Sequence, residues 1–395
     1  MSMRWTGAMT LLGALLGAGL GACGGAGEVD LGAAPAPAPA PAPDPAQSWT
    51  WSLPAHFTPP QAPADNPMTQ AKFELGRVLF HDLRLSGTGI QSCASCHRQE
   101  RAFTDGLPLS RGATGDFTSR NSQPLANVAW QQTLTWARSD LNSIEQQAEV
   151  PLFGTHPIEI GITEANRDAI LQLLRSDPAL LTRFQQAYPA DVAQNSDPVA
   201  LPRIVQALAT YQRGLVSADS LFDRVLQGRA ELDASAQRGR ELFFGERARC
   251  VQCHVSDQLG QPFQPAPFHN TGLYNLDGRG AYPSDSTGLI AQTGQASDMG
   301  RFRVPSLRNV ALTAPYLHDG SAATLEEVLA SYAAGGRLIA TGPNAGDGRL
   351  NPYKSPTVQA IAETSLSAQD QADLIAFLRS LTDEAFVRDP KLGPP

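Results

Sequence analysis

The chain has 395 residues, which is enough for two or three domains of ordinary size. Its 30 Lys and Arg against 38 Asp and Glu give a formal net charge of -8, and this acidic balance disfavours a nucleic-acid binder, which normally carries a basic surface. Four of the 5 cysteines lie in two Cys-x-x-Cys-His motifs and the other is Cys23, so none is left for a disulfide scaffold.

Residues 1–23 are typical of an export signal. Arg4 provides the positive start, and the apolar stretch 9–16 is too short and too interrupted by glycine to span a membrane as a helix. The segment ends in Leu20-Gly21-Ala22-Cys23, which resembles the bacterial lipobox, where the cysteine is lipidated after cleavage. We therefore expect a lipid on Cys23 that anchors the protein on the periplasmic side of a bacterial membrane, with the outer membrane favoured. An ordinary signal peptide, which would release a soluble periplasmic protein, is the alternative.

Residues 24–66 form the predicted tether. Proline alternates mostly with alanine between Pro35 and Pro45, and such a segment forms neither a helix nor a central strand. Proline-rich segments adopt an extended, semi-rigid conformation that rises about 3.1 Å per residue. A lipid anchor followed by this tether would hold a folded enzyme away from the membrane.

The folded part is predicted to contain two copies of one plan, at residues 67–217 and 218–385, followed by a short tail at 386–395. In both copies a helix carries Gly-Arg-x-Leu-Phe ahead of the Cys-x-x-Cys-His motif. Thr69 is expected to cap the first of these helices and Ser235 the second. The two sequences are Gly76-Arg77-Val78-Leu79-Phe80 and Gly239-Arg240-Glu241-Leu242-Phe243.

An apolar helix closes each copy, and we expect Ser367 to cap the second of them. No alternating strand pattern of any length competes, so the chain is expected to be mainly helical with long loops. The apolar residues of the closing helices are Ile204, Leu208, Tyr211 and Leu215 in the first copy, and Leu374, Ile375, Phe377, Leu378 and Leu381 in the second.

The motifs Cys93-Ala94-Ser95-Cys96-His97 and Cys250-Val251-Gln252-Cys253-His254 are typical of c-type haem attachment. Two thiols form thioethers with the haem vinyl groups, and the adjacent histidine binds the iron. One copy could be a thiol redox motif, and both together could form a zinc site if they met at one ion. Because each motif lies in its own repeat behind an export signal, we expect two covalently bound haems. The predicted fold is mainly α, with two c-type cytochrome domains and long loops.

The sixth ligands of the two irons stay open at this point. Electron-transfer cytochromes often use Met, and after the signal segment the chain has only Met68 and Met299. His56 lies too close to the tether to be a convincing ligand. The other candidate histidines are His81, His156, His269 and His318, and sequence reasoning does not choose among them.

Three segments besides the haem motifs are Leu75-Gly76-Arg77-Val78-Leu79-Phe80, Arg120-Asn121-Ser122 and Pro305-Ser306-Leu307-Arg308-Asn309-Val310-Ala311-Leu312-Thr313-Ala314-Pro315-Tyr316. With the motifs, they resemble the bacterial di-haem cytochrome c peroxidases and their MauG branch, from about Lys72 to Leu381. The stretch from Cys96 to Gly106 is most similar to the MauG-like enzymes. The lipoprotein-like start resembles the MbnH group, which modifies a partner protein.

The resemblance implies a first haem that is open to substrate. In the peroxidases, a loop beyond the first haem histidine supplies a second histidine that closes the iron until activation. Here Ala113 and its neighbours occupy that stretch, and the sequence has no histidine between His97 and His156. This pattern matches MauG, in which the first haem is open without activation.

At the second haem, the resemblance implies Tyr332 as the iron ligand opposite His254. The family's Met ligand follows a Tyr-x-His-x-Gly segment, here 316–320, and Tyr332 stands at the aligned position, where MauG has a tyrosine. An ordinary semi-buried aromatic is the alternative for Tyr332, and His318 is then expected to be structural. The helix around Tyr332 is expected to begin with a capping box of Thr324 and Glu327 and to end at Gly335-Gly336.

The resemblance also assigns the pocket above the first haem. Gln147 and Glu159 match the family's pocket glutamine and catalytic glutamate, although extra residues between them leave Glu149 and Glu164 as rivals for Glu159. Trp136 matches the tryptophan between the haems, with core packing as its alternative role. One calcium ion between the haems is implied by three matching residues with hard oxygen donors, Asn121, Thr313 and Pro315.

The implied activity is that of an oxidoreductase that uses hydrogen peroxide to form high-valent iron. The first hypothesis is a MauG-like enzyme that oxidises a side chain, with tryptophan expected, on an exported partner protein. The second is a cytochrome c peroxidase that reduces hydrogen peroxide with electrons from a small cytochrome or cupredoxin. The third is a non-enzymatic di-haem electron carrier, which a five-coordinate resting haem would exclude.

Overall fold

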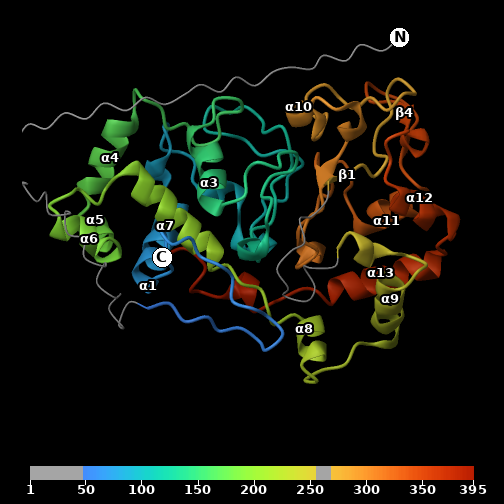
Figure 1. Ribbon diagram of the computed structural model, residues 1–395, viewed down its shortest axis with the longest axis horizontal. Coiled ribbons are helices and arrows are strands. Elements are labelled where there is room, and N and C mark those ends of the chain that lie inside the picture. The colour runs from blue at the N-terminus through green and yellow to red at the C-terminus, as the bar shows by residue number, and fades with distance from the viewer. Residues whose placement is uncertain (1–47, 255–267) are drawn as a thin grey trace, which may run out of the picture. The chain divides into compact units, whose positions relative to one another are not determined.

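The computed structural model describes residues 48–254 and 268–395 (Figure 1). The export signal, Cys23 and the alternating prolines of the tether lie outside these residues, so the expectations about export and lipidation stay predictions. No helix within the two described ranges is long and apolar enough to cross a membrane.

The first half begins with α1 (Gln70–His81), which Thr69 caps as predicted. The Thr69 hydroxyl accepts a hydrogen bond from the backbone N–H of Lys72 at 3.2 Å. Proline stands in the first turn of α5, α6 and α7, where its missing N–H costs no helical hydrogen bond. The other helices of this half are α2 (Cys93–Cys96), α3 (Ile144–Phe153), α4 (Arg167–Arg175), α5 (Pro178–Ala187), α6 (Pro189–Ala193) and α7 (Leu201–Arg213).

The second half contains α8 (Leu221–Leu226), α9 (Ala234–Phe244), α10 (Ile290–Thr293), α11 (Leu325–Ala333), α12 (Pro356–Glu363) and α13 (Ala368–Arg379). Ser367 caps α13 as predicted, with a reciprocal bond to Asp370. The predicted cap of α9 is wrong. Asp233 accepts from the N–H of Ala236 at 2.8 Å, whereas the hydroxyl of Ser235, two residues later, donates to Asp373 at 2.6 Å.

The predicted capping box of α11 forms only in part. The Thr324 hydroxyl accepts from the N–H of Glu327 at 3.2 Å, but the Glu327 carboxylate accepts from the N–H of Ala323 at 2.7 Å rather than from that of Thr324. The helix ends as expected, because Gly335 follows with a φ of 72°. Both bonds hold the start of the helix that carries Tyr332.

Strands are short and few in the described ranges. β1 (Phe268–His269) pairs antiparallel with β2 (Phe302–Arg303), and β3 (Leu338–Ile339) pairs antiparallel with β4 (Gly346–Asp347). Phe268 lies opposite Arg303 in the first pair. The prediction of a mainly α fold with long loops is confirmed.

In each half the helix before the haem motif packs closely against the closing helix, α1 against α7 and α9 against α13 (Figure 1). A Cβ atom added at Gly76 would lie 2.0 Å from the carbonyl oxygen of Ala207. One added at Gly239 would lie 1.9 Å from that of Asp373. The glycine of the repeated Gly-Arg-x-Leu-Phe sequence therefore allows the two helix backbones to touch.

An asparagine ties each closing helix to the loop beyond its haem motif. The N–H of Asn127 donates to Leu215 O at 2.9 Å, and the N–H of Asn309 donates to Leu381 O at 3.0 Å. Both asparagines adopt the left-handed conformation, with φ of 58° and 60°. Ser217 is buried between them, and it bonds to the side chains of both. The two halves thus share one buried polar junction.

The predicted tether extends too far along the chain. Residues 48–66 pack on the folded body rather than forming a spacer: Phe57 is 6% exposed against Trp130, and Trp49 packs against Phe73 with ring centroids 4.9 Å apart. The reason is composition, because this stretch carries aromatic residues that the alternating Pro-Ala segment lacks.

The predicted C-terminal tail is also part of the folded body. Phe386 and Leu392 are buried in the core of the first half, although they follow the second half in sequence. The Tyr211 hydroxyl donates to Leu392 O at 2.6 Å, and the Gln99 amide donates to Phe386 O at 3.0 Å. The last residues therefore cross back and cover the first half.

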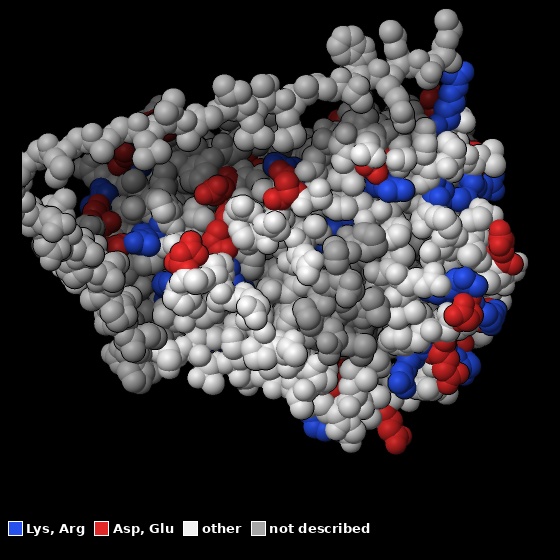
Figure 2. Space-filling view, in the orientation of Figure 1, with Lys and Arg blue, Asp and Glu red and all other residues white. Residues whose placement is uncertain are grey.

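Figure 2 shows acidic and basic side chains interspersed on one face of the molecule. Many charged side chains of the described residues pair, as Arg247 does with Asp370 at 2.8 Å. Exposed pairs of this kind contribute little to stability. The pair between Arg308 and Asp223 differs, because both side chains are buried and two bonds of 2.8 and 2.9 Å join them. His56 also contacts Asp223, at 3.5 Å.

Candidate functional site

The first cavity is built around Cys93, Cys96 and His97. The space that it outlines, together with the open solvent at its mouth, is about 1820 Å³. His97 Nδ1 lies 2.8 Å from Phe103 O, so its other ring nitrogen is the one that can bind a metal. Phe103 supplies this contact through its backbone carbonyl, and sequence reasoning missed it because any residue carries a carbonyl.

The second cavity is built in the same way around Cys250, Cys253 and His254. It encloses about 1580 Å³, mouth included, and its wall is mostly apolar. His254 Nδ1 lies 3.2 Å from Pro305 O, which orients the imidazole as Phe103 O orients that of His97. Each cavity thus offers two thiols, one oriented imidazole and a large apolar space, and these residues fit a covalently attached haem.

The zinc alternative does not fit the structure. The two cysteine pairs line separate cavities. Within residues 48–254 and 268–395, no group of three or more His, Cys, Asp and Glu side chains could hold a metal ion. Burial raises the pKa of the Cys93 thiol to about 12, and that of Cys250 also to about 12, so neither is set up as a reactive thiolate.

Gln147 and Glu159 both line the first cavity, Gln147 from α3 and Glu159 from the loop after it. Burial raises the pKa of the Glu159 carboxyl above its ordinary value, which suits a group that must both accept and return a proton. The rivals lie elsewhere: Glu149 is exposed on α3, and Glu164 is paired with Arg167 at 2.7 Å at the surface. The geometry therefore favours Glu159 over both.

The loop that would carry a closing histidine lies against the Glu159 segment. The N–H of Ala113 donates to Glu159 O at 2.8 Å, and a Cβ at Gly112 would lie 1.9 Å from Ile158 O. This close contact holds the loop in place without any side chain that could bind iron. His156 lies at the exposed rim of the same cavity.

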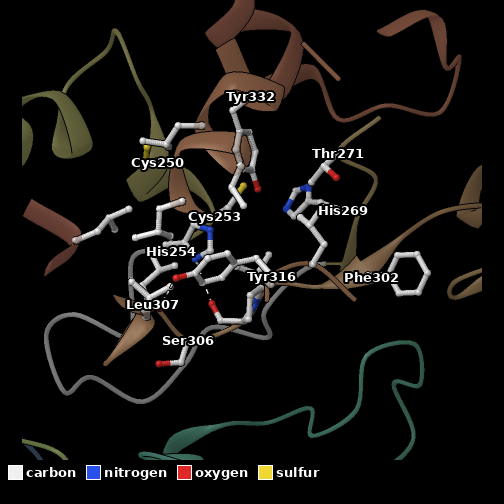
Figure 3. A pocket seen from close by; sticks show the side chains of 18 of the residues that line it. Cys250, Cys253, His254, His269, Thr271, Phe302, Ser306, Leu307, Tyr316 and Tyr332 are labelled. Carbon is white, nitrogen blue, oxygen red and sulfur yellow. Dashed lines mark hydrogen bonds between the residues drawn. The ribbon is translucent and has the colours of Figure 1, made fainter. Parts of the chain in front are cut away.

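Two side chains with possible ligand atoms, Tyr332 and His269, face the second cavity across from the haem motif. Figure 3 shows the Tyr332 phenol and the imidazoles of His254 and His269 turned into the same space. Burial raises the pKa of Tyr332, so the phenol is protonated unless a cation binds its oxygen. His269 Nε2 is buried and has no hydrogen-bond partner among the described residues, which makes His269 the strongest rival ligand.

The other candidate ligands are placed less favourably. His318 lines the second cavity but stacks on Phe302 at 3.5 Å, and burial lowers its pKa to about 4, so it is a neutral packed ring. Neither Met68 nor Met299 lines either cavity. His81 is held by its own helix through a contact of 2.9 Å with Arg77 O.

Trp136 lies between the two cavities and lines both of them. It is 9% exposed, and its indole N–H donates to Asn121 O at 2.8 Å. Its ring packs in a cluster with residues of the second half, among them Tyr282 and Phe302. Trp136 is therefore both a packed core residue and a residue that lies between the two cavities.

The three residues expected at a calcium ion line the second cavity together. Asn121 also lines the first cavity, so the group lies between the two sites. The side-chain NH2 group of Asn121 donates to Leu107 O at 2.8 Å, so the side-chain oxygen of Asn121 points away from Leu107. Thr313 and Pro315 lie on either side of Ala314. Each of these two residues has a backbone carbonyl oxygen, which is a ligand type that calcium binds.

A mainly helical fold with two large cavities, each holding a cysteine pair and an oriented histidine, defines a di-haem c-type oxidoreductase. The family model for the di-haem cytochrome c peroxidases matches residues 70–231. The chain is 36% identical to the cytochrome-c peroxidase IdrP1 of Denitromonas iodatirespirans over 362 residues, 85% of this chain and 88% of the relative. The chain belongs to the di-haem cytochrome c peroxidase and MauG family, and it is a haem-dependent, peroxidase-type enzyme.

Two further relatives are of the MauG kind. The methylamine utilization protein MauG of Methylorubrum extorquens is 32% identical over 341 residues, 84% of this chain and 85% of the relative. A crystal structure of a MauG-like protein associated with microbial copper homeostasis is 50% identical, with a TM-score of 0.84, and covers 88% of this chain and 99% of its own. The predicted family and fold class are thereby confirmed.

Proposed function

We propose that this di-haem enzyme uses hydrogen peroxide to oxidise a side chain, with tryptophan expected, on an exported partner protein. The observation that carries the proposal is the second cavity, where Tyr332 and no methionine of the described residues stands across from His254. Bound haem would supply peroxide activation and the storage of two oxidising equivalents. An anionic phenolate lowers the potential of iron relative to a thioether, which favours storage over rapid exchange with a donor.

The residues of the first cavity handle the protons of peroxide. Glu159, with its raised pKa, takes the proton from one peroxide oxygen and delivers it to the other. Gln147 lies in the same wall and positions the peroxide by hydrogen bonding. The loop around Ala113 leaves this side open from the start, so no reducing partner is needed to unlock it.

Trp136 connects the two cavities. Its indole lies in the wall of each, and a bond to Asn121 O fixes its orientation. Electrons can therefore pass from one haem site to the other through a single ring. A calcium ion bound by Asn121, Thr313 and Pro315 would hold this wall, and its loss is expected to weaken the coupling between the haems.

The choice of a partner protein rests on resemblance and on the start of the chain. A relative at 50% identity is described as MauG-like and associated with copper homeostasis, which favours a MauG-type reaction over donor oxidation. A lipid on Cys23 and the proline-rich tether would keep the enzyme at the periplasmic side of a membrane, where exported proteins are reached.

The test combines haem-loaded enzyme, hydrogen peroxide and the small exported protein encoded beside this chain, and then maps the partner by peptide mass spectrometry. We expect oxygen addition or a kynurenine-type shift at a tryptophan, absent without peroxide. Trp136→Phe should abolish it. Trp130→Phe is the matched control, because Trp130 is equally buried and also bonds a backbone carbonyl, Thr58 O at 2.9 Å, but lines neither cavity.

Cytochrome c peroxidase activity is the second candidate, and the identity to relatives with that name favours it. The same mixture with a reduced small cytochrome added distinguishes the two. A partner that stays unmodified while peroxide is consumed with a reduced small cytochrome would establish the peroxidase and exclude partner oxidation.

A further inference from the structure

A line of aromatic rings runs from the first cavity to two tryptophans at the start of the described chain. Phe80 lines the cavity, with its ring centroid 6.4 Å from that of His97. The next centroid distances along the line are 4.9 Å from Phe80 to Tyr211, 5.4 Å to Phe73, 4.9 Å to Trp49 and 5.4 Å to Trp51. Every step is a ring contact.

The arrangement follows from the helix pairing. Phe73 and Phe80 are seven residues apart on α1, so they project from the same face, toward α7 and its Tyr211. Gly214, just beyond α7, makes room for the far end of the line, because a Cβ there would lie 2.5 Å from Phe73 and 3.3 Å from Trp49. Trp49 and Trp51 themselves are only partly buried.

We propose that Trp49 and Trp51 form a surface oxidation site that gives up electrons to the first haem site through Tyr211. The site lies apart from Trp136, which is 9% exposed and lies between the two cavities. The proposal requires only the family's peroxide chemistry, so it stands or falls independently of partner-protein oxidation.

The chemistry uses the two side-chain types that lose an electron most readily, tryptophan and tyrosine, with phenylalanine rings bridging the short gaps between them. When Tyr211 loses an electron, its phenolic proton stays in the 2.6 Å hydrogen bond to Leu392 O and returns when an electron arrives from Trp49. Tyr211 therefore ends unchanged, and the tryptophans carry the net oxidation.

The electrons and atoms balance with peroxide and water alone. Hydrogen peroxide takes up two electrons and two protons and yields two water molecules. A tryptophan that loses two electrons and two protons and adds one water molecule gains one oxygen atom. One hydrogen peroxide is thus consumed for each oxygen added, and no other oxidant is required.

The experiment treats the haem-loaded protein with hydrogen peroxide in the absence of any partner and maps oxygen addition by peptide mass spectrometry. We expect the added oxygen on Trp49 and Trp51. Tyr211→Phe should remove most of it, because phenylalanine does not accept the intermediate oxidation. Haem content and the unfolding temperature are measured on each variant.

The matched control is Tyr188→Phe. Tyr188 is buried in the same half and its hydroxyl also donates to a backbone carbonyl, Arg203 O at 2.7 Å, but no aromatic ring of the described residues contacts it. This variant should oxidise Trp49 and Trp51 as the parent does. Trp49→Phe provides a second test at a partly exposed position, where oxidation of Trp51 should fall without a change in folding.

Met68 reports on diffusible oxidants, because it lies beside α1, partly exposed and outside the line of rings. Equal oxygen addition at Trp49 and Trp51 in the Tyr211→Phe protein would overturn the proposal. So would oxidation of Met68 in parallel with the tryptophans in every variant, since it would indicate attack from solution. If a partner protein stays unmodified while Trp49 and Trp51 are oxidised through Tyr211, the oxidation site at Trp49 and Trp51 is supported and partner oxidation is rejected.

Discussion

Tyr332 and His269 are the two candidate ligands for a second haem iron, and they enter the second cavity from different elements. Tyr332 comes from α11, while His269 comes from β1 and has a buried ring nitrogen with no hydrogen-bond partner among the described residues. The two ligand sets differ in charge when bound, because a phenolate is anionic and an imidazole is neutral. The reduction potential of the second haem should therefore distinguish ligation by Tyr332 from ligation by His269.

We predict that Tyr332→Met gives the second haem thioether-like ligation and a higher reduction potential without loss of haem. The physical reason is the replacement of an anionic oxygen by a neutral sulfur. Electronic spectra and redox titration measure both changes. His269→Gln is the control and should leave them as they are; if the control shifts the spectrum and Tyr332→Met does not, His269 is the ligand.

We predict that Glu159→Gln keeps both haems but slows the reaction with peroxide by about a hundredfold or more, the usual scale for a lost acid–base group. Stopped-flow spectroscopy of the first haem measures the rate. Glu149→Gln is the matched control, because this glutamate is exposed on α3. A slow Glu149→Gln protein beside an unaffected Glu159→Gln protein would reverse the assignment.

The ionisation of Glu159 should also make the rate of the peroxide reaction depend on pH. Burial raises the pKa of Glu159, and only the ionised form can accept the peroxide proton. The rate should therefore fall as the pH drops through this raised pKa, which lies above that of an exposed glutamate. The Glu159→Gln protein should lose this step in its pH–rate profile, and a step that persists there would belong to another group.

At the scale of elements, the repeated glycines explain why the same short sequence precedes both haem motifs. Gly76 and Gly239 lie where a helix backbone meets the carbonyl of its closing helix at van der Waals distance. In most helix positions alanine stabilises relative to glycine by about 0.5–1 kcal/mol. Here the added methyl group would collide with backbone, which cannot rotate away.

We predict that Gly239→Ala lowers the free energy of unfolding by about 1–3 kcal/mol, the usual cost of overpacking. Gln237→Ala, on the same helix with its side chain bonded only to Glu241, is the control and should be close to neutral. Denaturant unfolding of the haem-loaded proteins measures both. A stabilised Gly239→Ala protein would show that α9 and α13 can separate without cost.

At the scale of the whole molecule, a buried ion pair joins segments that lie far apart in the sequence. Arg308 of the second half pairs with Asp223 after the junction, beside His56 from the start of the described chain. Burial pushes the pKa of Asp223 up, but the bonds and charge of Arg308 hold it below its ordinary value. The pair therefore stabilises the protein at neutral pH, and this stabilisation is lost as the pH falls through the lowered pKa.

We predict that Arg308→Met lowers the free energy of unfolding by about 3–5 kcal/mol, because it leaves a buried carboxylate without its cation. The exposed arginine Arg379 pairs loosely with Glu326 at 4.0 Å, so Arg379→Met is the control and should have no measurable effect. Thermal and denaturant unfolding report both. An Arg308→Met protein as stable as the control would mean that the buried pair does not stabilise the fold.

The haem motifs, the helix before each of them and the closing helices could be predicted from sequence because each depends on residues close together in the chain. Thr69 and Ser367 cap helices that begin one residue later, and such contacts need no knowledge of the rest of the fold. The cap of α9 was missed because Asp233 and Ser235 are equally plausible locally. Asp373, from a distant helix, decides between them by binding the Ser235 hydroxyl.

By itself, the sequence determined that this protein carries two haem attachment motifs and a mainly helical repeat, that no histidine lies between His97 and His156, and that position 332 is not a methionine. Only the tertiary structure decided that Trp136 lines both cavities, that His269 rivals Tyr332, and that the residues at 48–66 and 386–395 complete the first half. The physical reason is that covalent attachment and helix formation depend on neighbouring residues. Cavity walls, ring contacts and backbone carbonyl partners instead depend on how the segments pack in three dimensions, which leaves no local pattern in the sequence.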